Sequence, residues 1–412
     1  MKKIAAIFNT NQLGGAERSF AIQLSMIKED FLISCYIPKI SKKPDSSIYN
    51  FLLELGFTDI RHFDMPKNFY RLSRDARIYS YIFFFLSFFE IFYHLPKYSS
   101  FKRYDTIYAN GNKAGFFFYL IGTILFFKNK IIWHFRDYPV KRRIWKIFLL
   151  PGRFDLMFVG NSKSVLNEMK KMLPKKYPKT YIYNPSRVDL KNDLNFPVPQ
   201  KIERIGIVSM MAPWKGVHQI IIFAHLFEKE LLDLGIKEIA IFGANIYKTK
   251  GGHHHYENQC NKLLEKFPSI LISFKGRKEP DEIFKHIHLL LHTSIRPEPF
   301  GRVITEAFSY GIPVISTALG GAAELIIDKE TGLTFFAHDY KGLLNSIKTL
   351  ISSEMFVRKL VKNSTSHLIN IEVDIKKRLL RILTESRLVE GLRNEPTVSK
   401  RQEGPKSKGP NS

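Results

Sequence analysis

The stretch HLLLHTSIRPEPFGRVITEAFSYGIPVIST, residues 288–317, contains a complete strand–helix–strand pattern. The apolar run at 288–292 predicts a buried strand, and a proline-rich loop follows it. Apolar residues at 303, 304, 307 and 308 then recur at helical spacing, and PVIST (313–317) predicts the next strand. This stretch therefore predicts one βα unit of a parallel sheet.

Similar alternations occur along most of the chain. A first series begins at KIAAIF (3–8) and runs to KSVLNEMKKML (163–173), and a second series begins at RIGIVSM (204–210) and includes the stretch above. Repeated units of this kind predict parallel sheets covered by helices. We expect an α/β protein with two Rossmann-like, doubly wound parallel-sheet domains, whose carboxyl strand ends face each other across a cleft.

The domain boundaries follow from where this alternation stops. A length of 412 residues already favours two domains. The segment PSRVDLKNDLNFPVPQK (185–201) is rich in proline, asparagine and charge, which is typical of a linker. The predicted organisation is a first domain over 1–185, a linker over 186–201, a second domain over 202–368, a closing helix over 369–392 and a disordered tail over 393–412.

The sequence indicates a cytoplasmic protein. Its two cysteines, Cys35 and Cys260, lie far apart without metal-ligand spacing, as expected in a reducing compartment. The apolar run at the N-terminus is too short for a signal peptide. The apolar stretches 81–93 and 115–127 are also shorter than the roughly 20 residues that a transmembrane helix needs.

The net charge of +25 is concentrated in the first half of the chain, where residues 1–200 carry +17. Such charge indicates either a solvated basic surface or an anionic partner. Segments 141–153 and 170–179 mix cations with aromatic and aliphatic residues, which favours peripheral contact with an anionic membrane surface, on the cytoplasmic face of the inner membrane. We expect no nucleic-acid partner, because no nucleic-acid-binding module is recognisable.

Two acids frame the start of the helix predicted after residue 300. Glu298 lies on the preceding loop, and Glu306 lies in the second turn of a helix that starts near Gly301. The unpaired amides of Gly301, Arg302 and Val303 would form an anion site. Carboxylates repel phosphate but accept hydrogen bonds from hydroxyls, so a sugar nucleotide fits this frame. The alternative is that both acids are solvated surface groups.

This frame, together with GGAAELIIDKETGL (320–333), resembles the signature of glycosyltransferase family 4, which comprises retaining enzymes of the GT-B fold. The likeness is close over about 35 residues, and GGAER (14–18), VGNSKSV, YNP, WKGV, IFG and FKGR follow in the family's order over 1–350. The resemblance implies hexosyl transfer from a nucleoside diphosphate sugar to a hydroxyl of a saccharide or lipid-linked acceptor, with retention. It also implies a place in bacterial cell-surface polysaccharide or lipopolysaccharide synthesis.

The resemblance assigns residues to the donor site. Glu306 would bind the ribose hydroxyls and Glu298 the hydroxyls of the transferred sugar, beside the backbone amides of Phe300 and Gly301. Lys215 matches a lysine that clamps the diphosphate. The loop FKGR, which ends at Arg277, is similar to the one that packs on the nucleobase.

One position departs from the family pattern. Met210 stands where these enzymes have an arginine that also binds the diphosphate. Removing such a group from a closed site costs several kcal/mol of charge stabilisation. Arg302, Arg277 and Arg296 are the candidate replacements.

The first domain contributes two further candidate groups. Gly14 and Gly15 follow the first strand, where absent side chains let the backbone approach a phosphate, although a plain βα turn has the same pattern. In KIIWHFRDYP (130–139), His134 and Arg136 lie on one face of a strand, and either one matches the family's histidine near the transferred sugar. The alternative for His134 is a structural role beneath Trp133 and Tyr138.

No metal or other cofactor is expected, because the sequence lacks an Asp-x-Asp motif and the histidines at 253–255 are consecutive. The resemblance implies that a donor phosphate oxygen takes the acceptor's proton, so the protein mainly positions reactants and stabilises charge. Two other functions remain open. One is a catalytically inactive sugar-nucleotide-binding protein, which the residue at 210 favours, and the other is a GT-B phosphorylase or epimerase.

Overall fold

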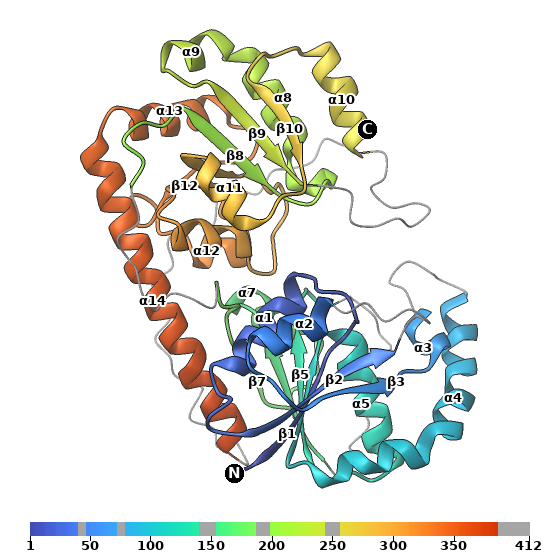
Figure 1. Cartoon of the computed structure of the whole chain (residues 1–412). Helices are drawn as coiled ribbons and strands as arrows, with labels where there is room; N and C mark the ends of the chain where they lie inside the picture. The colour runs from blue at the N-terminus through green and yellow to red at the C-terminus, as the bar shows by residue number, and fades with distance from the viewer. Residues whose placement is uncertain (40–46, 72–78, 140–153, 187–197, 244–255, 386–412) are drawn as a thin grey trace.

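The computed structural model describes residues 1–39, 47–71, 79–139, 154–186, 198–243 and 256–385, with the side chains at 70, 71, 79–85 and 88 left out. The core of the predicted linker (187–197), the basic segment 141–153, the histidines at 253–255 and the predicted tail lie outside these residues. Figure 1 shows two α/β bodies, one above the other, joined along one side by a long helix.

The first domain contains a seven-stranded sheet in the order β3-β2-β1-β4-β5-β6-β7, and all neighbouring strands are parallel. Its strands are β1 (Lys3–Ile7), β2 (Leu32–Lys39), β3 (Ile60–Asp64), β4 (Thr106–Asn110), β5 (Lys130–Phe135), β6 (Asp155–Gly160) and β7 (Lys179–Tyr181). Its helices are α1 (Gly15–Ser25), α2 (Ser47–Glu54), α3 (Lys67–Arg71), α4 (Tyr79–Tyr98), η1 (Ser99–Arg103), α5 (Asn112–Ile124) and α7 (Lys163–Met172).

The second domain has a six-stranded parallel sheet in the order β10-β9-β8-β11-β12-β13. Its strands are β8 (Arg204–Val208), β9 (Glu238–Phe242), β10 (Ile272–Gly276), β11 (Leu289–His292), β12 (Val314–Ser316) and β13 (Leu333–Thr334). Its helices are η2 (Pro213–Lys215), α8 (Val217–Leu226), α9 (Glu228–Asp233), α10 (Tyr256–Lys266), α11 (Pro280–His286), α12 (Arg302–Ser309), η4 (Gly321–Glu324) and α13 (Tyr340–Ile351).

Both sheets have the strand order of a doubly wound fold, so the predicted fold class is confirmed. In each sheet the order reverses beside the first strand, between β1 and β4 in one and between β8 and β11 in the other. Loops that leave such a point at the carboxyl ends of the strands form the ligand site of this architecture. The loops after β8 and β11 carry Lys215 and Glu298.

The final helix, α14 (Glu354–Thr384), runs unbroken through position 368, where a domain boundary was predicted, and lies along both domains in Figure 1. Apolar residues on it are buried in a cluster that contains residues of both sheets. Lys2 Nζ donates to the carbonyl oxygen of Thr384 at 2.8 Å, and Lys130 Nζ donates to that of Glu385 at 2.6 Å. These contacts tie the end of the second domain to the base of the first.

The apolar stretches that were judged too short to span a membrane form helices of the first domain. Most of 115–127 lies in α5, where Phe117 and Phe118 are fully buried against the sheet. The stretch 81–93 lies in α4, at the edge of the first domain opposite α14 (Figure 1). Among the described residues, none of the helices combines the length and the apolar character that crossing a bilayer requires.

Candidate active site

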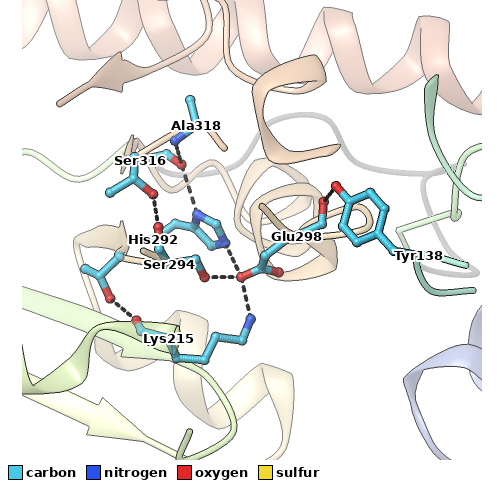
Figure 2. Close-up of polar contacts among 9 residues, drawn as sticks. Tyr138, Lys215, His292, Ser294, Glu298, Ser316 and Ala318 are labelled. Atoms are coloured by element: carbon cyan, nitrogen blue, oxygen red, sulfur yellow. Dashed lines mark hydrogen bonds and ion pairs between the residues drawn. The ribbon is translucent and has the colours of Figure 1, made fainter. Parts of the chain in front are cut away.

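The carboxylate of Glu298 is the centre of a buried polar cluster (Figure 2). The buried strand β11 ends at His292, and the loop after it turns Glu298 back toward that residue. His292 Nε2 lies 2.9 Å and Lys215 Nζ lies 2.5 Å from Oε1 of Glu298, and the Ser294 hydroxyl donates to the same oxygen. The other oxygen, Oε2, accepts no hydrogen bond from the residues that the structure describes.

A chain of hydrogen bonds fixes the orientation of His292. The amide of Ala318 donates to Ser316 Oγ at 2.9 Å, and Ser316 Oγ lies 2.9 Å from His292 Nδ1. An ionised carboxylate can only accept, so Nε2 carries a proton and donates to Glu298.

Glu298 stays ionised at neutral pH. Its burial by itself raises the pKa of the carboxyl group, but the charges and hydrogen bonds of His292 and Lys215 outweigh burial and hold that pKa well below its usual range. A carboxylate with so low a pKa is a weak general base. It is well suited to accept hydrogen bonds from hydroxyls and to stabilise positive charge.

The backbone around Lys215 is tightly constrained. Gly216 has φ +75°, and a Cβ at this position would overlap the carbonyl oxygen of Thr293. The Thr293 hydroxyl in turn donates to the carbonyl oxygen of Lys215 at 2.7 Å. The ammonium group lies 4.4 Å from the centre of the Trp214 ring, a cation–π contact. Lys215 is therefore held in place next to Glu298.

The second acid of the frame lies on α12, as the sequence predicts. Gly301, with φ +92°, occupies the N-cap position of this helix, and no side chain there accepts a hydrogen bond from the first amides of the helix. The amides of Gly301, Arg302 and Val303 have no acceptor within the described part of the chain, so they are available to an anion. Glu306 is buried, and its Oε1 lies 3.0 Å from a guanidinium nitrogen of Arg302.

The first domain meets this helix at the glycine pair. Gly15 starts α1, and its carbonyl oxygen accepts a hydrogen bond of 3.3 Å from Arg302 Nη1. A Cβ on Gly15 would lie 3.4 Å from that nitrogen, an ordinary van der Waals contact. The structure thus brings Gly14 and Gly15 to the start of α12, where the prediction placed the donor phosphates.

Tyr138 links the two domains at the Glu298 loop, a contact that sequence reasoning missed. Its hydroxyl donates to the carbonyl oxygen of Glu298 at 2.8 Å (Figure 2). The same hydroxyl lies 2.8 Å from Ser164 Oγ. Close by, the carboxylate of Glu324 accepts hydrogen bonds from the amides of Lys163 and Ser164 at the start of α7. No sequence signal identified these residues, because the partners belong to different domains.

His134 and Arg136 lie inside the first domain. His134 is fully buried, and its Nδ1 lies 2.9 Å from the hydroxyl of Tyr108, whose ring is stacked on the imidazole. It packs against Tyr108 and not beneath Tyr138. Burial, reinforced by the charge of Arg136, lowers the pKa of His134 well below its usual value, so the ring is neutral.

Arg136 is held by side-chain amide oxygens from three segments. Its guanidinium donates to Asn110 Oδ1 at 2.6 Å, to Asn184 Oδ1 at 2.6 Å and to Gln23 Oε1 at 2.8 Å. Burial lowers the pKa of Arg136 to about 10, so it remains charged at neutral pH. No described contact connects His134 or Arg136 to Glu298.

The remaining candidates differ in exposure. Phe300 is buried, and its ring centre lies 5.7 Å from that of Tyr183, so its side chain packs between the domains. Arg277, directly after β10, is exposed, and so is Arg296 on the loop after β11. Met210, directly after β8, is half-buried.

Comparison with known proteins identifies the second domain. Residues 191–367 match the family model of the glycosyl transferases group 1. The capsular polysaccharide biosynthesis glycosyltransferase CapM of Staphylococcus aureus is 26% identical over 154 residues, which are 36% of this chain and 37% of CapM. A trehalose synthase of Pyrococcus horikoshii is 30% identical over 159 residues, or 38% of this chain and 37% of that enzyme. These alignments span well under half of the relatives' length.

Solved structures of similar architecture cover nearly the whole chain. Anabaena HepE in complex with UDP and glucose has a TM-score of 0.70 at 20% identity and covers 93% of this chain and 99% of that chain. TarM has a TM-score of 0.68 at 12% identity, with 93% and 99% covered. At such low identity these likenesses show the fold alone, which is the two-domain GT-B fold, and with the family match they confirm the GT-B resemblance.

Proposed function

We propose that this chain, which has the GT-B fold and a second domain of the glycosyl transferases group 1, transfers a hexosyl unit from a nucleoside diphosphate sugar to a hydroxyl of a saccharide or lipid-linked acceptor. One observation carries the proposal. Each acid of the frame is paired with a cation, Glu298 with Lys215 and Glu306 with Arg302, on either side of an uncapped helix N-terminus.

Such a site is neutralised internally and is complementary to a sugar nucleotide. The diphosphate would accept hydrogen bonds from the amides of Gly301, Arg302 and Val303 and from the ammonium group of Lys215. The hydroxyls of the sugar would donate hydrogen bonds to the carboxylate of Glu298, and those of the ribose would donate to the carboxylate of Glu306. HepE has been solved in complex with UDP, with UDP and glucose, and with UDP-glucose, which supports a donor of this class.

The low pKa of Glu298 favours a mechanism in which the protein supplies no strong base. In the proposed reaction the acceptor attacks the face that the diphosphate leaves, and a donor phosphate oxygen takes its proton, so configuration is retained. Glu298 would stabilise positive charge at the sugar, and Lys215 with the helix amides would stabilise the departing diphosphate. We propose that the reaction needs no metal, so EDTA should leave the rate unchanged.

Replacing Glu306 by glutamine tests the donor site. The change removes a charged acceptor for the ribose hydroxyls, so we expect donor affinity to fall about 10- to 100-fold, the effect of losing one hydrogen bond to a charged group. The donor is found first by a thermal-shift screen of UDP-, GDP- and ADP-sugars, and affinity is then measured by calorimetry. Glu265→Gln, an exposed helical acid on α10, is the matched control.

The same screen separates the alternatives. Donor binding without turnover over many acceptors would favour a catalytically inactive sugar-nucleotide-binding protein, which the methionine at position 210 motivates. Release of a sugar phosphate in the presence of inorganic phosphate would favour a phosphorylase, and interconversion of two sugar nucleotides an epimerase. If no sugar nucleotide binds, the proposed function is wrong.

We further propose that the acceptor is reached at an anionic membrane surface, in bacterial cell-surface polysaccharide or lipopolysaccharide synthesis on the cytoplasmic face of the inner membrane. The exposed face of α4 supports this, because Phe89, Phe92 and Tyr93 are 63%, 55% and 83% exposed. The only acid of α4, Glu90, is turned away and accepts hydrogen bonds from Asn68 on α3. Residues 67–103 contain seven lysines and arginines against two acids. Aromatic side chains among cations suit a lipid interface.

Sedimentation with vesicles tests this surface. We expect the protein to bind phosphatidylcholine vesicles only when they contain phosphatidylglycerol, and binding should weaken as salt is raised. Phe89→Glu with Tyr93→Glu should abolish binding. A matched pair of exposed apolar residues on the second domain, Ile270→Glu with Met355→Glu, should keep it. Absence of binding at both low and moderate salt would contradict membrane contact.

A further inference from the structure

The proposed donor site lacks one positive charge, because Met210 stands where the family resemblance expects an arginine. Lys215 is the one matching cation, and in this structure it is paired with Glu298. A diphosphate leaving group carries charge that a single lysine neutralises only in part. Binding of the diphosphate therefore calls for a second cation that reaches the start of α12.

We propose that Arg302 supplies this second positive charge and grips the diphosphate in place of a cation at position 210. This inference rests on the proposed function and deepens it. Arg302 is the first residue of α12, and its guanidinium lies between the carbonyl oxygen of Gly15, at 3.3 Å, and the carboxylate of Glu306, at 3.0 Å. It thus lies between the N-terminus of α1 and that of α12, two helix ends whose dipoles both favour an anion.

In the donor-free site Arg302 is paired with Glu306, and a bound diphosphate can replace Glu306 as the partner of the guanidinium. A diphosphate offers the guanidinium fork two oxygens at once, in competition with the ion pair that the guanidinium makes with Glu306 in this structure. When the guanidinium turns to the phosphates, Glu306 loses its partner and becomes free to accept the ribose hydroxyls. One movement of Arg302 therefore prepares both the phosphate contact and the ribose contact.

The other two arginines do not share this position. Arg277 and Arg296 are exposed, and no described hydrogen bond or ion pair connects either of them to α12 or to the glycine pair of the first domain. The side chain of Arg302, by contrast, is only 28% exposed and already bridges the two domains.

Calorimetry on the full chain with UDP, GDP and ADP, each compared with its nucleoside, tests the inference. For whichever diphosphate the wild type binds, we expect Arg302→Ala to weaken affinity about 10- to 100-fold. Affinity for the nucleoside should not fall, because Glu306 keeps its carboxylate for the ribose hydroxyls, whereas a merely structural role would weaken both. Arg302→Lys should lie between the two, because lysine keeps the charge but loses the planar fork. The melting temperature without ligand reports on folding.

Three further variants make the result decisive. Met210→Arg in the Arg302→Ala background should recover most of the lost diphosphate affinity, and a double variant no tighter than Arg302→Ala contradicts the replacement. Arg277→Ala and Arg296→Ala should show no loss selective for the diphosphate. If one of them does and Arg302→Ala does not, the inference is overturned while the proposed function stands. If the wild type binds none of the three diphosphates, both are overturned.

Discussion

Replacing Glu298 by glutamine is expected to reduce the rate of sugar transfer about 100- to 1,000-fold, the usual effect of removing one preorganised electrostatic contact from an active site. Oε1 of Glu298 is occupied by His292, Ser294 and Lys215, so the amide oxygen of glutamine would take that place. The NH₂ group would then replace Oε2, which accepts no hydrogen bond from the described residues. An NH₂ group cannot accept a hydrogen bond from a sugar hydroxyl, and it does not stabilise positive charge at the sugar.

The same substitution should also destabilise the second domain. Removing the charge leaves the ammonium of Lys215 without its counterion in a largely buried position, a change that costs about 3 kcal/mol or more. Rates must therefore be compared at a temperature where circular dichroism shows the variant folded. Glu330→Gln, an exposed acid of the same domain, serves as control. A folded Glu298→Gln variant with the rate of the wild type would exclude the assigned role.

Glu17 should make the stability of the first domain depend on pH. This carboxyl group lies in the first turn of α1, and its burial raises its pKa from 4.5 to about 7, although a backbone hydrogen bond and the charge of Arg136 partly oppose burial. Between these two values the folded chain holds a proton that the unfolded chain releases. The free energy of unfolding contributed by this group is therefore fully present below about pH 4.5 and falls by about 3 kcal/mol as pH rises to 7.

Urea unfolding of the wild type and of Glu17→Gln at several pH values between 4.5 and 8 measures this effect. Glutamine cannot ionise, so the variant should become the more stable protein as pH rises, with the difference growing up to about pH 7. Glu29→Gln, an exposed acid just after α1, should show the pH dependence of the wild type. Parallel stability curves for wild type and Glu17→Gln would disprove the raised pKa.

Regular patterns in the sequence predicted the architecture. The runs at 3–8 and 204–210 became β1 and β8, and the helical spacing after Gly301 became α12, because buried parallel strands and the helices that cover them leave strong apolar periodicity. The strands β2, β3, β7 and β13 were not among the predicted strands. In β2 the apolar run is interrupted by Ser34 and Pro38, so its pattern is weaker than that of β1.

The contacts within the site could be predicted only in part. The local spacing of the sequence predicts the frame of Glu298 and Glu306, but only the folded structure shows which cations pair with these two acids. Lys215 is 83 residues away from Glu298, and only the family resemblance placed it in the same site. The sequence prediction placed Arg136 on one strand face with His134, as a candidate near the transferred sugar, yet side-chain amides from three distant segments surround it. The bond from Tyr138 to Glu298 depends on how the domains are placed, which no local pattern encodes.

That placement is governed by α14, which is anchored to both bodies. Ser186 donates to Glu372 on this helix at 2.8 Å through its amide, and the guanidinium of Arg378 lies 4.2 Å from the ring centre of Tyr181. Its apolar face is buried in a cluster with residues of both sheets, so separating the domains at the side of α14 would expose apolar residues to water. A domain opening that keeps these contacts therefore pivots at the side of α14, and we expect the side far from α14 to open widest when substrate enters.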